Sequence, residues 1–155
     1  MDGLSIGIAG AGIGGLAAAS LLADRGHRVT LFDQFEAPRP VGSGLVVQPV
    51  GLAVLGEIGA ANRARDLGAP ITRMRGLEAQ TGRTVLDVSY GREPGLALHR
   101  SALFAALHEA ACRRRIALRA GARITGRDGE RFRFADGTGS EEFDLLVDAS
   151  GARSP

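Results

Sequence analysis

A run of glycines near the N-terminus has the spacing of a phosphate-binding turn. Gly10, Gly12 and Gly15 form the pattern Gly-x-Gly-x-x-Gly, and Asp33 follows 23 residues after Gly10. Bare main-chain N–H groups in such a turn bind a diphosphate, and an acid at this distance accepts hydrogen bonds from a ribose. A carboxylate there also repels an added 2′-phosphate, which favours FAD or NAD over NADP. The pattern predicts dinucleotide binding; the alternative is a glycine-rich turn that binds nothing.

The segments around these residues predict the elements that would position them. Residues 4–9 suit a short buried strand, and residues 16–25 carry the small and apolar side chains of a helix packed on a sheet. Gly26 stands where a glycine commonly ends a helix, and residues 27–33 form a second strand that ends on the acid. A strand, a helix and a strand within about 30 residues is typical of a parallel crossover.

The middle of the chain predicts elements outside this unit. Residues 34–44 hold two prolines and two glycines close together, which indicates an exposed loop. A short helix is expected over residues 50–58, directly after Pro49. Residues 71–78 and 84–89 predict a hairpin of extended segments outside the main sheet.

The last third of the chain predicts a helix, a meander and a return to the main sheet. Apolar residues at helical spacing indicate a helix over residues 101–113. Segments 116–119, 122–127 and 130–135 are punctuated by the turn dipeptides Asp128-Gly129 and Asp136-Gly137 and predict an antiparallel β-meander. Residues 143–148 are an apolar run fit for a central parallel strand. The expected fold class is α/β, Rossmann-like, with a parallel central sheet and an antiparallel meander.

Length and composition limit the classes of protein to which the chain can belong. A chain of 155 residues has the size of one domain with a single core. Its hydrophobic content of 45% and net charge of +2 fit poorly with intrinsic disorder or with a nucleic-acid-binding surface. All basic residues apart from the histidines are arginine, which indicates GC-rich codons and a bacterial source.

The cysteine content and the N-terminus predict a cytoplasmic protein. Cys112 is the single cysteine, so it forms no internal disulfide and indicates a reducing compartment. The first residues lack the basic region of an export signal, and no apolar stretch reaches the length of about 18 residues that a membrane span needs. Neither an export signal nor a membrane anchor is expected.

Five segments of the chain, taken together, resemble the FAD-dependent aromatic hydroxylases, which are flavoprotein monooxygenases of the p-hydroxybenzoate hydroxylase type. Each segment is weak evidence alone, but the combination is specific and spans nearly all of the chain. The segments are residues 10–15, 29–33, 42–59, 99–103 and 144–154.

The resemblance implies which residues would hold FAD. The glycine turn would line the pyrophosphate, and Asp33, where the family more often has Glu, would bind the adenosine ribose with Gln34 beside it. Arg100 would reach a phosphate or the ribityl chain, although a solvated surface arginine is the alternative, and the Arg123–Ile124 backbone would lie by the adenine. The predicted cofactor-binding residues are Gly10, Gly12, Ile13, Gly14, Gly15, Asp33, Gln34, Arg100, Ile124, Ser150 and Gly151.

The chain departs from the family pattern in two ways. The segment that usually reads Gly-Ala-Asp-Gly is Asp148-Ala149-Ser150-Gly151 here, so Ser150 replaces an acid that would contact FAD and help nicotinamide binding. Related halogenases and reductases often carry this version and remain alternatives. The family's third flavin motif and most of its substrate-binding sheet are absent from the 155 residues. Residues 1–155 are therefore expected to be the N-terminal FAD-binding part of a longer monooxygenase, with residues 71–98 in a substrate-domain sheet.

The implied activity belongs to that longer protein. NAD(P)H would reduce the flavin, which would then react with O₂ and hydroxylate a small aromatic substrate. No catalytic side chain is assigned, and the 155-residue chain alone is expected to be inactive. Two alternatives stay open: a non-catalytic module that self-associates through an exposed sheet edge, and half of an NAD-dependent dehydrogenase.

Two further clusters have simpler interpretations. His108 and Cys112 stand four residues apart and resemble an incomplete zinc motif, but a partly buried helix face explains them, and no metal site is predicted. Arg113, Arg114 and Arg115 lack interleaved aromatic residues, so a solvated helix end is favoured over a nucleic-acid contact.

Overall fold

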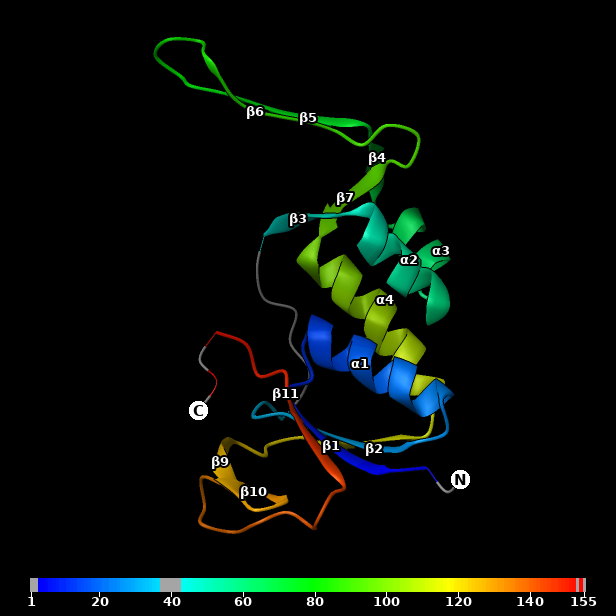
Figure 1. Ribbon diagram of the computed structural model, residues 1–155, viewed down its shortest axis with the longest axis vertical. Helices are drawn as coiled ribbons and strands as arrows, with labels where there is room; N and C mark the ends of the chain where they lie inside the picture. Colours follow the sequence, from blue (N-terminus) through cyan, green and yellow to red (C-terminus); the bar gives the residue numbers. More distant parts are fainter. Residues whose placement is uncertain (1–2, 37–42, 153, 155) are drawn as a thin grey trace.

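The computed structural model describes residues 3–36, 43–152 and 154, and these form layers of sheets and helices. Figure 1 shows helices between a parallel sheet on one side and a smaller antiparallel sheet on the other. Most of the predicted loop at residues 34–44 lies outside the described residues, and Gly44 begins a strand.

The parallel sheet carries the elements that the glycine pattern predicted. Its strand order is β11-β1-β2-β8, and every neighbouring pair is parallel. The register aligns Ala9 with both Phe32 and Asp148, so the carboxyl ends of three strands meet at one edge. The strands are β1 (Ser5–Ala9), β2 (Arg28–Phe32), β8 (Ile116–Arg119) and β11 (Leu145–Asp148).

Small side chains allow the helices to pack closely between the sheets. Helix α1 connects β1 to β2 and packs against α4, and both bury alanines at their contact faces, such as Ala19 and Ala106. No helix among the described residues is long and apolar enough to cross a membrane. The helices are α1 (Ile13–Asp24), α2 (Pro49–Glu57), α3 (Ala61–Asp66) and α4 (Arg100–Cys112).

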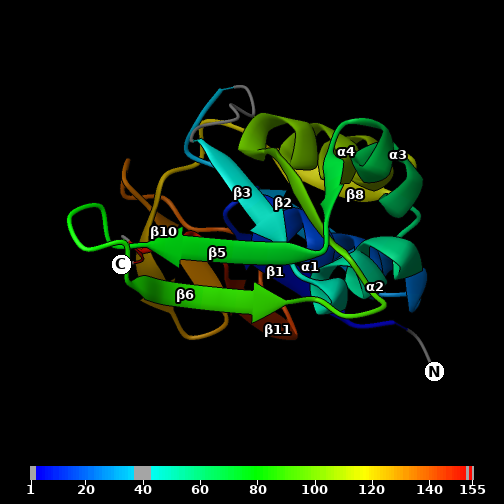
Figure 2. The same ribbon diagram turned by 90° about the horizontal axis from the view of Figure 1, so that it is seen from above.

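A second region continues beyond the helices. Strands β3, β7 and β4 form an antiparallel sheet, and the hairpin of β5 and β6 projects from the body (Figure 1). Seen from above in Figure 2, the hairpin lies across the same side of the molecule as β3. The strands are β3 (Gly44–Val47), β4 (Ala69–Ile71), β5 (Arg73–Leu77), β6 (Thr84–Ser89) and β7 (Gly95–His99).

An aromatic cluster joins a second hairpin to the parallel sheet. Strands β9 (Ile124–Asp128) and β10 (Arg131–Phe134) pair antiparallel. The Phe32 ring meets the rings of Phe132, Phe134 and Phe143 at centroid distances of 5.5, 5.6 and 5.9 Å. These contacts cover the face of β2 opposite the helices, so the two central strands, β1 and β2, are largely buried on both faces, whereas β8 stays mostly exposed.

The structure confirms the α/β class, the first βαβ unit, the hairpin near residues 71–89 and the helix near residues 101–113. Placing residues 116–119 in the meander was wrong. That segment is β8, which pairs parallel with β2 because helix α4 carries the chain back to the start of the sheet. Only β9 and β10 form the predicted antiparallel pair, and within the described chain β11 pairs with β1 alone, at an edge of the sheet.

Arg114 joins three helices, and its loss is expected to destabilise the fold. Its guanidinium binds both Asp24 carboxylate oxygens, at 2.7 and 2.6 Å, and donates to the main-chain oxygens of Ala110 and Ile58. The side chain is 17% exposed. We expect Arg114→Ala to lower the free energy of unfolding by about 1–2 kcal/mol, because several partly buried hydrogen bonds disappear. Chemical denaturation measures this difference.

A control and the pH dependence make the test specific. Arg113→Ala removes only an exposed pair with Glu109 and should cost less than about 0.5 kcal/mol. Hydrogen bonds from Arg114 lower the pKa of Asp24 from its ordinary 3.8. The contribution of the pair is therefore complete above that value and is lost as the pH falls through the lowered pKa. Equal losses from the two variants at neutral pH would contradict this role for Arg114.

Candidate cofactor-binding site

A cavity of about 1080 Å³ opens where β1, β2 and β11 end. Ligands in open α/β sheets bind at the carboxyl ends of the strands, and this volume lies just above the usual range of roughly 300–1,000 Å³ for ligand pockets. All predicted cofactor-binding residues line it except Gly15. Those lining it are Gly10, Gly12, Ile13, Gly14, Asp33, Gln34, Arg100, Ile124, Ser150 and Gly151.

Two glycines of the turn, Gly10 and Gly15, allow close packing of the main chain, and the other two leave space for a ligand. Gly10 has φ of +94°, and a Cβ there would lie 2.6 Å from the main-chain oxygen of Ala149. A Cβ at Gly15 would lie 1.9 Å from the main-chain oxygen of Gly10. Gly15 therefore lies away from the cavity because its role is to let α1 pack against the turn.

The other two glycines leave the entrance of α1 open. A Cβ at Gly12 or Gly14 would meet nothing within 4 Å. Helix α1 begins at Ile13 with Gly12 as its N-cap, and no side chain caps the first N–H groups. These uncapped N–H groups, together with the positive end of the helix dipole, favour an anion in the open space.

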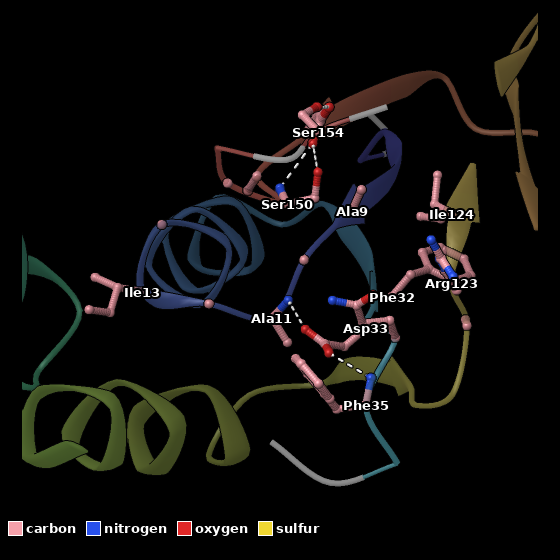
Figure 3. Close-up of a pocket in the computed structure, with 18 of the residues that line it drawn as sticks. Ala9, Ala11, Ile13, Phe32, Asp33, Phe35, Arg123, Ile124, Ser150 and Ser154 are labelled. Atoms are coloured by element: carbon pink, nitrogen blue, oxygen red, sulfur yellow. Dashed lines mark hydrogen bonds between the residues drawn. The ribbon is translucent and has the colours of Figure 1, made fainter. Parts of the chain in front are cut away.

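Asp33 holds the glycine turn as well as facing the cavity. Its Oδ2 accepts a hydrogen bond from the main-chain N–H of Ala11 at 2.8 Å, and its Oδ1 accepts one from Phe35 N–H at 3.0 Å (Figure 3). Each carboxylate oxygen can accept more than one hydrogen bond, so acceptor capacity remains for a ligand hydroxyl. The sequence predicted the acid at this place, but it did not predict its bond to the glycine turn.

Two arginines bring positive charge to the cavity. Arg100 is the first residue of α4, and Arg123 lies in the connection from β8 to β9. Within the part of the chain that the structure describes, neither guanidinium forms an ion pair or a hydrogen bond. Guanidinium groups with free donors bind phosphate oxygens strongly.

Asp148 organises the wall opposite Asp33. Its Oδ1 accepts hydrogen bonds from the Ser150 hydroxyl at 2.6 Å and from Ser150 N–H at 2.9 Å, and its Oδ2 accepts one from the Ser154 hydroxyl. Hydrogen bonds from Ser150, and then from Ser154, lower the pKa of the Asp148 carboxyl. Because both Ser150 donors are engaged, its hydroxyl retains acceptor capacity only.

Sequence reasoning missed several lining residues. Phe35 and Ala122 follow strands β2 and β8, while Asp148 ends β11 and Ser154 lies beyond it. For Phe35 and Asp148, the signal was their place at the ends of parallel strands, since the carboxyl ends of such strands meet at one edge.

The described residues contain no group of three or more potential metal ligands. His108 and Cys112 do meet on α4, with 3.7 Å between Cys112 Sγ and His108 Nδ1. The His108 ring also stacks on Phe104, with 5.8 Å between centroids.

Residues 4–155 match a family described as the FAD binding domain. The chain belongs to the FAD-binding domain family of the flavin monooxygenases. It is 35% identical over 153 residues to 2-heptyl-3-hydroxy-4(1H)-quinolone synthase of Mycobacteroides abscessus, covering 95% of this chain and 40% of that protein. It is 34% identical over 166 residues to 3-amino-4-hydroxybenzoate 2-monooxygenase of Streptomyces cremeus, covering 97% and 40%.

Solved structures agree on the fold. The tetrameric form of 2-methyl-3-hydroxypyridine-5-carboxylic acid oxygenase superposes with a TM-score of 0.87 at 24% identity, covering 99% of this FAD-binding domain and 41% of that chain. The domain thus spans about 40% of the length of the curated relatives named above. The predicted resemblance to FAD-dependent aromatic hydroxylases is confirmed, and the match favours FAD over the dehydrogenase alternative.

Alanine substitutions at Gly15 and Gly14 are expected to have different effects on stability, because only Gly15 packs against the main chain. Gly15→Ala places a Cβ against the main chain of Gly10, so we expect a loss of about 1–3 kcal/mol in the free energy of unfolding. Gly14→Ala enters open space within the same helix and should leave stability unchanged or raise it by up to about 1 kcal/mol. Denaturant titration of the two variants measures this, and similar stabilities would refute the packing role.

Proposed function

We propose that this FAD-binding domain holds FAD across the ends of β1, β2 and β11. The observation that carries the proposal is the open, uncapped entrance of α1 beside Gly12 and Gly14, where a Cβ would occupy the space of a phosphate. The donors there, the flanking arginines and the Asp33 carboxylate have the chemistry of diphosphate and ribose recognition.

Different residues of the chain would bind the pyrophosphate and the ribose of FAD. Main-chain N–H groups at the start of α1 and the guanidinium of Arg100 neutralise the pyrophosphate. Asp33 accepts hydrogen bonds from the ribose hydroxyls while it keeps Ala11 in place, and its charge disfavours a 2′-phosphate. When bound, FAD supplies the redox chemistry, and the protein contributes position and electrostatics.

We further propose that the longer protein is an NAD(P)H-dependent monooxygenase acting on a small aromatic substrate. Support comes from the names of the curated relatives, one of which is a monooxygenase of an aminohydroxybenzoate. Bacterial relatives and the single, exposed Cys112 support a bacterial and cytoplasmic protein.

Residues 71–98 are proposed to belong to a substrate-domain sheet. The hairpin of β5 and β6 projects from the body, and Leu77, Val85 and Leu86 are 53%, 61% and 41% exposed (Figure 1). An isolated two-stranded hairpin is marginally stable in water, so further strands or another layer would complete it.

A second candidate function is an interaction module. Within the described residues β11 pairs on one side only, and Leu145 on this strand is 44% exposed. A strand edge of this kind offers main-chain groups to a strand of a second copy.

Gly12→Ala is expected to weaken FAD binding without unfolding the protein. The added methyl group meets nothing in the free chain, but it occupies the space proposed for a phosphate. We expect the FAD dissociation constant to rise at least about tenfold, the equivalent of about 1.4 kcal/mol. Flavin fluorescence titration measures the constant.

Matched variants distinguish this effect from a general one. Gly56→Ala, in α2, also enters open space and should leave FAD affinity unchanged. Asp33→Ala should weaken FAD, and the unmodified chain should bind FAD more tightly than NAD. Loss of affinity in Gly56→Ala equal to that in Gly12→Ala, or preference for NAD, would argue against the proposal.

The 155-residue chain with FAD is expected to oxidise NADH no faster than free FAD does. The domain spans only about 40% of its relatives, and its projecting hairpin lacks the strands proposed to complete it. Loss of NADH absorbance under air, with and without the protein, measures this rate. Robust turnover would show that the chain needs no further residues for flavin reduction.

A further inference from the structure

Phe35 places an exposed aromatic ring in the cofactor cavity. The side chain lines the cavity, and the residue is 46% exposed. Phe32, Phe132, Phe134 and Phe143 instead pack against one another, and Phe35 forms no aromatic pair within the described residues. Core packing therefore does not explain this ring, and large apolar groups exposed in a concave site are typical of ligand contacts.

The main chain holds Phe35 in place. Its N–H donates to Asp33 Oδ1 at 3.0 Å, and its carbonyl oxygen accepts a hydrogen bond from Gly121 N–H at 3.1 Å. The Asp33 carbonyl oxygen accepts another from Ala122 N–H at 2.8 Å. The segment after β2 is thus tied to the connection before β9, so a ligand that uses this ring would spend little free energy on ordering the backbone.

This end of the cavity suits a flat base attached to a ribose. Phe35 lies two residues beyond the carboxylate proposed to hold the ribose, and Ala122 and Ile124 add apolar surface there. Figure 3 shows Asp33 and Phe35 at one end of the pocket and Ser150 and Ser154 at the other, with Ile124 and Arg123 along one side between them. The glycine turn, with its anion-binding N–H groups, lies between these ends.

We propose that Phe35 is the platform on which the adenine ring of FAD stacks. The inference rests on the proposed function, because it places the phosphates at α1 and the adenosine ribose at Asp33. A base linked to that ribose then falls on the side of the cavity that Phe35 lines, and the flavin half extends toward the opposite end. Stacking on an aromatic face needs no hydrogen bond from the base, so it requires no polar partner at this end of the cavity.

The test compares FAD with ADP, which has the adenosine and phosphates but no flavin. We expect Phe35→Ala to raise the dissociation constants of both ligands about tenfold, since both lose the same stacking contact. Phe35→Trp, which keeps a stacking face, should retain both affinities. Leu77→Ala removes a similarly exposed apolar side chain outside the cavity and should change neither. Calorimetric titration gives the constants, and denaturant unfolding verifies equal stability.

Each outcome decides a different claim. If the unmodified chain binds neither FAD nor ADP, the proposed function fails together with this inference. If FAD binds but Phe35→Ala changes no affinity, or if ADP alone does not bind, the function stands and the adenine platform is wrong. If Phe35→Ala weakens FAD but not ADP, Phe35 contacts the flavin half, and the assignment is overturned. Loss in both Phe35→Ala and Phe35→Trp would assign Phe35 a structural role instead.

Discussion

Main-chain atoms at Gly10 lie against two other segments of the chain, and no side chain fits between them. A Cβ at Gly10 would come within 2.6 Å of Ala149, and one at Gly15 would come within 1.9 Å of Gly10. These contacts bring the end of β1, the start of α1 and the end of β11 together. The cavity exists because three chain segments approach at a distance that only glycine permits.

The electrostatics of the cavity follow from this close approach. The start of α1 and two arginines supply positive charge, and the carboxylates of Asp33 and Asp148 lie at the ends of the two strands that flank β1. Each carboxylate is already bound by neighbouring donors, Asp33 by main-chain N–H groups and Asp148 by Ser150 and Ser154. Both acids therefore fix the shape of the wall, and the open donors face the space where an anion would bind.

The two regions of the chain differ in how completely they are packed. The two central strands of the parallel sheet, β1 and β2, are covered on both faces, by α1 and α4 on one side and by an aromatic cluster around Phe32 on the other. The hairpin of β5 and β6 leaves large apolar residues exposed. The difference in packing between the central strands and the hairpin is the basis of our proposal that residues 71–98 belong to a substrate-domain sheet.

Local patterns in the sequence were sufficient to predict the glycine turn, the acid after β2, the first helix and the hairpin of β5 and β6, because each depends on neighbouring residues. Ten predicted residues line one cavity: the glycine pattern predicted Gly10, Gly12 and Asp33, and the resemblance to the flavin hydroxylases implied the other seven. Tertiary structure alone decided that β8 joins the parallel sheet and that Phe35 and Asp148 line the cavity. Those outcomes depend on pairing between strands far apart in the chain, and periodicity within a segment does not encode which distant strand it will join.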